Sequence, residues 1–224
     1  MRNVWDSAYA HISIPEPDSQ NSWAVKNFRD FRYAPGTIIK ADWKTAVLNP
    51  ASVERAWYYV ALLPQFGPFK NLFAHTFLGF GLGDGTRVGF SIEARRHENE
   101  PYDPFIRGMF GRYEVTYLWG TLDDFEQRRV AYQEQTLERY ALNLSQPECG
   151  DFLVSALRAT KAGAAKPRRY HTITAQCTNL LRGIFNNARN PKLPWHPYWH
   201  LTGLSPHLFA KHNLLDLSSK EMFS

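Results

Sequence analysis

Cys177 is the residue of this chain best placed for covalent chemistry. It lies in the stretch 175–181, AQCTNLL, where a polar, β-branched run gives way to apolar residues with helical spacing. A thiol at the start of a helix faces the positive end of the helix dipole and unpaired first-turn N–H groups, which both favour the thiolate. Because the thiolate is the nucleophilic form, this position predicts a reactive cysteine. The alternative is a buried, inert thiol, which is the commoner fate of a lone cysteine.

A predicted β-hairpin carries the histidine that such a thiol needs. Two strand-like runs, residues 72–80 and 87–95, flank the glycine-rich stretch 81–85. His75 lies on the first strand and is the candidate general base for Cys177. The alternative for a histidine among aromatic residues on a strand is a structural, hydrogen-bonded role.

Glu93 is the candidate third member, and the strand register decides whether it reaches His75. Strand alternation places Ser91 and Glu93 on one face of the second strand. A connection of three or five residues brings that face to His75, whereas a two-residue connection turns it away, and the five residues 81–85 favour the first arrangement. Glu93 then holds the imidazole by its second nitrogen. The alternative is that Glu93 pairs with a neighbouring arginine.

The remaining elements are expected to build the scaffold around these residues. We expect strands at 27–33 (an edge strand that Pro35-Gly36 ends), at 53–63 and at 112–119. We expect helices at 122–143, 149–160 and 178–185, and an irregular aromatic segment after Asn190-Pro191. Because strands precede helices, this order indicates an α+β fold in which an antiparallel sheet packs against helices.

Composition and charge narrow the class of protein. The 224 residues are 44% hydrophobic and 15% aromatic, which suits one well-formed core and excludes a disordered chain. The net charge is +5 and the basic residues are spread along the chain, so nucleic acid is not an expected partner. Small basic clusters such as Arg128-Arg129 are expected to be solvated surface. No segment has the apolar length of a membrane span, and residues 1–20 lack the apolar core of a signal peptide.

The other cysteine and the C-terminal histidines raise two alternatives. Cys149 and Cys177 permit one disulfide, which would abolish the nucleophile, but we expect free thiols because one optional bridge does not make a disulfide scaffold. His196 and His200 have a spacing found in zinc sites, but Pro197 opposes a helix that would align them. We therefore expect no metal and no cofactor.

Several motifs occur in an order that resembles one protein family. They are NFRDFRY at 27–33, AHTFLGF at 74–80, SIEARR at 91–96, RYE at 112–114, CT at 177–178 and LSPHL at 204–208. Together they resemble the Lnb N-terminal periplasmic domain family of bacterial envelope proteins. The resemblance divides the chain into an N-terminal extension (1–22), a catalytic domain (23–216) and a tail (217–224).

Because this family includes a lipoprotein N-acyltransferase, the resemblance implies a fold and a set of catalytic roles. Histidine before cysteine is the order of a permuted papain-like (NlpC-type) core, with the cysteine at a helix N-terminus. The resemblance implies that Cys177 is the nucleophile, His75 the base and Glu93 the possible third member. It also implies a place in the periplasm or on the periplasmic face of the inner membrane.

Four further residues are expected to contact the substrate. Arg95 and Arg96 follow the third member in the family motif and are expected to shape the site or to bind a phosphate or carboxylate. Gln176 stands where the family commonly has asparagine, and its amide is expected to donate toward a developing oxyanion. Ser91 shares the strand face of the third member and is expected to line the same site.

The expected function is that of a thiol acyltransferase of the cell envelope. A thioester on Cys177 would carry an acyl group from a phospholipid or lipoprotein to a lipoprotein amine. One alternative is a papain-like thiol hydrolase that cuts an amide or ester with water as the acceptor. Another is a catalytically silent module that binds a membrane surface through aromatic and basic side chains.

Overall fold

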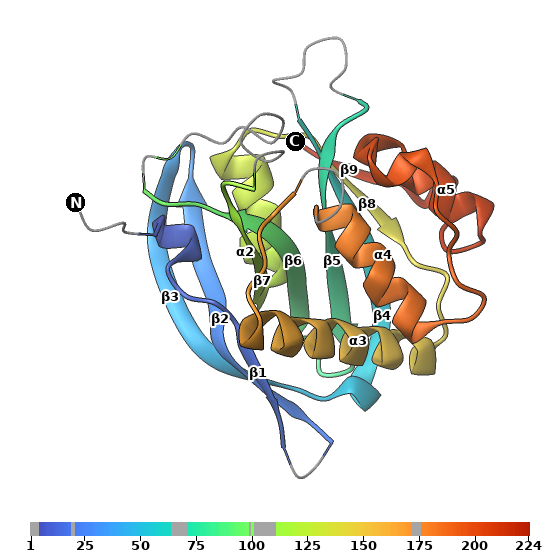
Figure 1. Cartoon of the computed structure of the whole chain (residues 1–224), viewed down its shortest axis with the longest axis horizontal. Coiled ribbons are helices and arrows are strands. Elements are labelled where there is room, and N and C mark those ends of the chain that lie inside the picture. The colour runs from blue at the N-terminus through green and yellow to red at the C-terminus, as the bar shows by residue number, and fades with distance from the viewer. Residues whose placement is uncertain (1–4, 19–20, 64–70, 99, 101–110, 172–175) are drawn as a thin grey trace.

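The computed structural model describes residues 5–18, 21–63, 71–98, 100, 111–171 and 176–224 (Figure 1). Its strands are β1 (Ile14–Pro17), β2 (Trp23–Ala34), β3 (Thr37–Leu48), β4 (Val53–Leu62), β5 (Ala74–Leu82), β6 (Arg87–Arg95), β7 (Glu114–Thr121), β8 (Leu137–Ala141) and β9 (Glu221–Phe223). Its helices are α2 (Leu122–Gln127), α3 (Gln146–Ala165), α4 (Cys177–Ala188) and α5 (Ser205–Lys211), and a π-helical turn, Arg128–Tyr132, continues α2. The structure confirms the α+β class.

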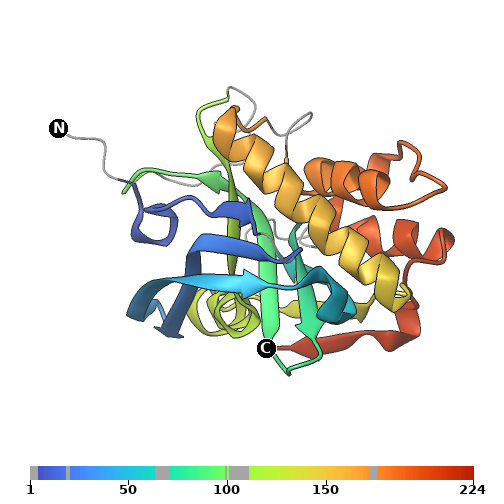
Figure 2. The same ribbon diagram turned by 90° about the horizontal axis from the view of Figure 1, so that it is seen from below.

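The strands form one nine-stranded mixed sheet in the order β1-β2-β7-β6-β5-β4-β8-β9, with β3 paired to β2. Among the strands of the described residues, only β2 and β7 run parallel, and they meet at a single pair, Arg29↔Gly120. Figure 1 shows α3 lying across the strands and α4 beside it. Figure 2 shows α2 on the opposite face. The sheet is therefore covered by helices on both faces around the middle strands.

Alternation along the central strands sends side chains into two separate cores. Phe80, Phe90 and Trp119 pack with Phe152 of α3 in the larger core. Phe77 packs with Tyr59 and Phe125 in the smaller core, on the α2 side. Most of these rings are fully buried, so each face of the sheet is fixed by aromatic packing. The register of β5 and β6 is thereby strongly specified.

A buried ion pair ties the β1–β2–β3 unit to the rest of the sheet. The Asp124 carboxylate accepts hydrogen bonds from Arg29 Nε (2.9 Å) and Nη2 (2.8 Å), and also from the Phe31 N–H and the Tyr33 hydroxyl. At the adjoining β2–β7 pair, a Cβ on Gly120 would lie 2.5 Å from the Arg29 carbonyl oxygen, so only glycine permits this approach. The Asp124 carboxylate therefore joins β2 to the rest of the sheet where β2 and β7 form only one residue pair.

Most of the expected elements are confirmed. They are the strands at 53–63 and 112–119, the hairpin, and the helices beginning near 149 and 178. Ser145 and Glu148 form a capping box, so α3 begins slightly earlier than expected. Both cysteines are free, as expected.

Three expectations about the elements were wrong. The helix expected at 122–143 ends after the π-helical turn, and Glu134, at φ 51°, reverses the chain into β8. The strand at 27–33 is internal, because β3 and β7 flank it. The sheet is mixed, because β2 and β7 are parallel. The sequence analysis also missed β3, whose residues are mostly exposed, and it missed α5 and β9 in the segment expected to be irregular after Asn190-Pro191.

We predict that Asp124→Ala lowers the free energy of unfolding by about 3–5 kcal/mol, because it leaves the Arg29 guanidinium buried without its counter-charge. Asp123→Ala, one residue away, removes only a half-exposed ion pair with Arg87 and should cost less than about 1 kcal/mol. Urea denaturation of the two variants measures both. Equal losses in the two variants would contradict the assignment of this interaction as the tie between the two parts of the sheet.

Candidate active site

The β5–β6 hairpin places Glu93 opposite His75, as expected from an odd connection. Phe77 pairs with Ser91 and Gly81 with Arg87, and this register continued by two residues sets Glu93 across from His75. His75 Nε2 lies 3.1 Å from Glu93 Oε1. The same nitrogen lies 2.8 Å from Ser91 Oγ, and the Ser91 hydroxyl donates to Glu93 Oε1 at 2.9 Å.

The resulting hydrogen bonds fix the orientation of the imidazole. Nε2 is held between a hydroxyl and a carboxylate, which leaves Nδ1 as the ring nitrogen available to a further partner. His75, Ser91 and Glu93 are 11% exposed or less, so these bonds lie away from bulk water. The ring cannot turn without breaking buried hydrogen bonds, which are costly to leave unmade.

Arg129 completes this network, and the sequence analysis missed it. Its Nη2 donates to Glu93 Oε1 at 2.6 Å, and its Nη1 donates to Gln133 Oε1 at 2.7 Å. Arg129 is 5% exposed and Arg128 is 2% exposed, so the expectation that this basic pair is solvated surface was wrong. The π-helical turn directs both guanidiniums under the sheet, where buried carboxylates and aromatic rings hold them.

Cys177 is the first residue of α4 and lies where β5 and β6 separate. The pairing of the two strands stops at Phe77, although both continue further. Beyond it, the Thr202 hydroxyl takes the place of β6: it accepts from the Ala74 N–H at 2.7 Å and donates to the Ala74 carbonyl at 2.6 Å. The backbone N–H of Thr76, between these points, helps to lower the pKa of the Cys177 thiol. The thiol therefore occupies the opening between the diverging strands.

Two hydroxyl groups and the imidazole surround the sulfur. Cys177 Sγ lies 3.7 Å from Thr178 Oγ1 and 4.0 Å from Thr76 Oγ1, and these two oxygens are 3.0 Å apart. Burial alone would raise the pKa of the Cys177 thiol, but hydrogen bonding and charge from His75, with help from Thr178 and the Thr76 N–H, lower it overall. The thiolate is thus stabilised in a site where only 6% of the residue is exposed.

The neighbouring groups shift in the complementary directions. Burial and the Arg129 charge act to lower the pKa of His75, but Glu93 and the Cys177 sulfur outweigh them and raise it. Burial opposes the ionisation of Glu93, yet the charges of His75 and Arg129 hold its pKa well below the usual range. Cys149 provides the contrast, because burial there raises the thiol pKa to about 11. An arrangement like that at Cys177 can deprotonate a thiol and return its proton to a leaving group.

Three of the four expected substrate contacts serve other purposes in this structure, and Ser91 and Gln176 are the first two. Ser91 is fully buried and supports His75 and Glu93 rather than lining an open surface. The amide nitrogen of Gln176 lies 2.6 Å from the Trp199 carbonyl oxygen and 3.5 Å from a ring nitrogen of His200. The amide is thus turned toward the C-terminal segment, and in this conformation it anchors the residue that precedes the thiol.

The two arginines that follow Glu93 both approach the N-terminal segment, and Arg96 does so with its Nη2 3.8 Å from Asp6 Oδ2 and its guanidinium 5.7 Å from the centre of the Tyr9 ring. Arg95 donates to the carbonyl oxygens of Tyr9 and Ala10 and lies 3.9 Å from the Trp5 ring, so it holds the N-terminal segment. The side chain of Arg96 lines a cavity of about 180 Å³ beside the imidazole. Its described lining also includes His75, Glu93, Arg129, Gln133 and Gln135.

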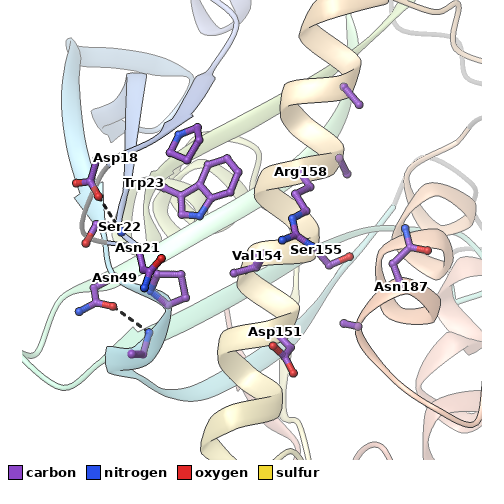
Figure 3. Close-up of a pocket in the computed structure, with 16 residues that line it drawn as sticks. Asp18, Asn21, Ser22, Trp23, Asn49, Asp151, Val154, Ser155, Arg158 and Asn187 are labelled. Carbon is purple, nitrogen blue, oxygen red and sulfur yellow. Dashed lines mark hydrogen bonds between the residues drawn. The ribbon is translucent and has the colours of Figure 1, made fainter.

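A larger depression lies elsewhere. A groove of about 1060 Å³ runs between α3, the end of α4 and the start of β2 (Figure 3). Asp151, Ser155 and Arg158 of α3 form one wall, and Asn187 stands near the C-terminal end of α4. Its described lining contains no cysteine or histidine, and Cys177 stands at the other end of α4. The groove is therefore separate from the candidate site.

Comparison with known proteins identifies one family. The profile of the family described as "Lnb N-terminal periplasmic domain" matches residues 40–202, which is most of the chain, and this confirms the resemblance seen in the sequence motifs. No curated protein and no solved structure matches the chain. Within the described ranges, no helix combines the length and apolarity needed to cross a membrane.

We predict that Cys177 reacts with iodoacetamide at lower pH than an ordinary thiol, because His75 stabilises its thiolate. The measurement is the alkylation rate against pH in a Cys149→Ala background, followed by mass spectrometry. His75→Ala should move the midpoint of that profile to higher pH. Cys149 in the intact protein is the internal control and should stay unreacted. A profile that does not move in His75→Ala would contradict the interaction.

We predict that Glu93 gives the protein a pH-dependent part of its stability. A carboxylate whose pKa is lowered by folding stabilises the native state above its unfolded pKa of about 4.3, and this contribution is lost as pH falls through the folded pKa. The unfolding free energies of the wild type and Glu93→Gln should therefore differ most at neutral pH and begin to converge as the pH falls below about 4. Urea titrations at several pH values test this, and a constant difference would refute it.

Proposed function

The chain belongs to the family of Lnb N-terminal periplasmic domains, and we propose that it is a cysteine-dependent acyltransferase of the bacterial cell envelope. The observation that carries the proposal is the first-turn thiol of α4 beside an imidazole that a buried carboxylate orients. A histidine on a sheet strand before a cysteine at a helix start is the order of a permuted papain-like core, which we propose for this fold.

In the first half of the proposed reaction, the Cys177 thiolate attacks the carbonyl carbon of an acyl ester. The new carbon–sulfur bond forms a tetrahedral intermediate, which collapses as the carbon–oxygen bond of the ester breaks. The leaving alkoxide takes the proton from Nδ1 of the His75 imidazolium and departs as an alcohol. The acyl group remains on Cys177 as a thioester, and His75 is neutral.

In the second half, an amine attacks the thioester. Neutral His75 accepts the amine proton at Nδ1 while the carbon–nitrogen bond forms, and the breaking carbon–sulfur bond returns the electron pair to Cys177. The thiolate and imidazolium are restored together. Glu93 stays ionised throughout and stabilises the imidazolium, because its carboxylate is held by both His75 and Arg129.

The seclusion of the site supports transfer over hydrolysis. Cys177 is 6% exposed and the His75 side chain 11% exposed, so a thioester formed there meets little bulk water. An amine delivered by a bound acceptor then has the advantage of position over water. We propose a lipoprotein amine as that acceptor and a phospholipid or lipoprotein as the source of the acyl ester.

Peripheral membrane contact is consistent with the surface next to the site. Trp195 is 63% exposed, and its ring stands 6.3 Å from that of His200, which neighbours the Gln176 amide. An exposed tryptophan suits the interface between water and lipid. Its position beside the residue that precedes Cys177 would bring the thiol near a membrane surface, where acyl esters are found.

We predict that Cys177→Ala abolishes N-acylation of a lipoprotein substrate, with a loss on the order of 10³-fold or more, because no other group replaces the attacking sulfur. Mass spectrometry of the acceptor measures the product, and of the enzyme the thioester. Cys149→Ala is the matched control and should keep the activity. Acylation that survives in Cys177→Ala would refute the proposal. If the thioester decays equally fast with and without amine, the reaction is hydrolysis and not transfer.

A further inference from the structure

Strand β3 has one unpaired edge. Its inner edge pairs with β2, and within the described ranges no strand pairs with its outer edge (Figure 1). The strand is 12 residues long and mostly exposed, so a long row of backbone N–H and C=O groups faces outward. Such an edge can extend its sheet by pairing with a strand of another molecule.

The side chains of β3 add apolar surface to this edge. Ile39 is 67% exposed and Val47 is 65% exposed, and they stand near opposite ends of the strand. Trp43, midway between them, is half-buried and packs edge-on against Phe31 and His11. Single exposed apolar residues are ordinary, but two on one open edge with an aromatic ring between them suit a strand partner.

The charges of β3 complement one another when the strand pairs with a second copy of itself. Two identical antiparallel strands of one sheet are related by a two-fold axis perpendicular to the sheet, so opposite residues lie on the same face. With the axis at Trp43, Asp42 of each copy lies opposite Lys44 of the other, which is a favourable cross-strand pair. These two side chains are each 48% exposed and make only surface ion pairs, with Lys40 and Asp30, so they can reach across.

The neighbouring registers are less favourable. An axis at Asp42 sets that carboxylate opposite its own copy and Lys40 opposite Lys44, and an axis at Lys44 sets two ammonium groups together. Like charges directly opposite each other destabilise a strand pair. An axis at Ala41 joins Lys40 to Asp42, but it carries Val47 beyond the end of the other strand. The register at Trp43 is the one that uses both the charges and the apolar residues.

Two features of β3 resemble those that keep edge strands from pairing, namely lysines and a β-bulge. The bulge lies between the pairs Arg32↔Lys40 and Tyr33↔Ile38, and β3 is regular over 40–48. The register at Trp43 sets residue 40 opposite residue 46, so its central part uses this regular segment. The lysines then disfavour pairing with other strands and in other registers.

We propose that β3 is a homodimer interface, in which two copies of this chain join their sheets about a two-fold axis at Trp43. The pairing brings Ile39 of each copy to Val47 of the other, so the two most exposed apolar side chains of the strand gain partners. The candidate site is built on β5, β6 and α4, and β3 belongs to none of its walls. The inference is therefore independent of the proposed acyl transfer.

The dimer and its register are tested together by charge reversal, with sedimentation velocity of the full chain from micromolar to millimolar concentration. We expect the wild type to be a reversible dimer. Asp42→Lys and Lys44→Asp should each raise the Kd at least about 10-fold, because like charges then face each other twice. An equimolar mixture of the two variants should form heterodimers, since each lysine again meets a carboxylate, and this recovery excludes misfolding as the cause.

Three results would overturn the proposal. They are a wild type that stays monomeric or assembles beyond a dimer, a Lys44→Asp variant that still forms its own dimer, and a mixture of the two variants that stays monomeric.

The edge that carries the interface is tested by two matched substitutions. Val47→Lys places a charge against Ile39 of the other copy and should raise the Kd at least about 10-fold. Met222 is 60% exposed on β9, at the other edge of the sheet, so Met222→Lys should leave the Kd unchanged. Equal effects of the two substitutions would contradict the assignment of the interface to β3.

Discussion

A single buried carboxylate holds the candidate site together. Glu93 is 7% exposed, and one of its oxygens accepts hydrogen bonds from a guanidinium, an imidazole and a hydroxyl. Removing such a charge from water costs several kcal/mol, and only close counter-charges and hydrogen bonds offset that cost. The result is a line of alternating charge that runs Arg129, Glu93, His75, Cys177. Because His75 lowers the pKa of the Cys177 thiol and Glu93 raises the pKa of His75, the ionisation of the sulfur depends on a group two side chains away.

The sequence was sufficient to relate His75 to Glu93, since strand alternation and the odd length of the connection set the register. The helix that begins at Cys177 also followed from a local pattern, and the free state of both cysteines was expected because one optional bridge does not make a disulfide scaffold. The family resemblance rested on motifs spread along the chain, and the profile match over residues 40–202 agrees with it. The strand register and the helix start share a local cause, because each depends on spacing within a short segment.

The features that could not be predicted depend on contacts between distant segments. Arg129 lies 36 residues beyond Glu93, in a stretch whose pattern indicates a regular helix, and only the π-helical turn directs its side chain under the sheet. A carboxylate on a buried strand face needs a cation nearby, and this requirement was the one signal in the sequence that could have indicated Arg129. Strand β3 was overlooked, although Ile39, Ala41 and Trp43 alternate with polar residues in the pattern of a half-buried strand. Thr202 replaces a strand partner from a segment with no periodicity at all.

That replacement has a consequence for the order in which the molecule matures. The edge of β5 beside the thiol is completed by Thr202, and the residue before the thiol is anchored by the Trp199 carbonyl. Both partners are synthesised after Cys177 and well after His75. A growing chain therefore carries the sulfur before it carries the groups that seal its surroundings. The surroundings of Cys177 are therefore complete only after the segment that contains Trp199 and Thr202 has docked.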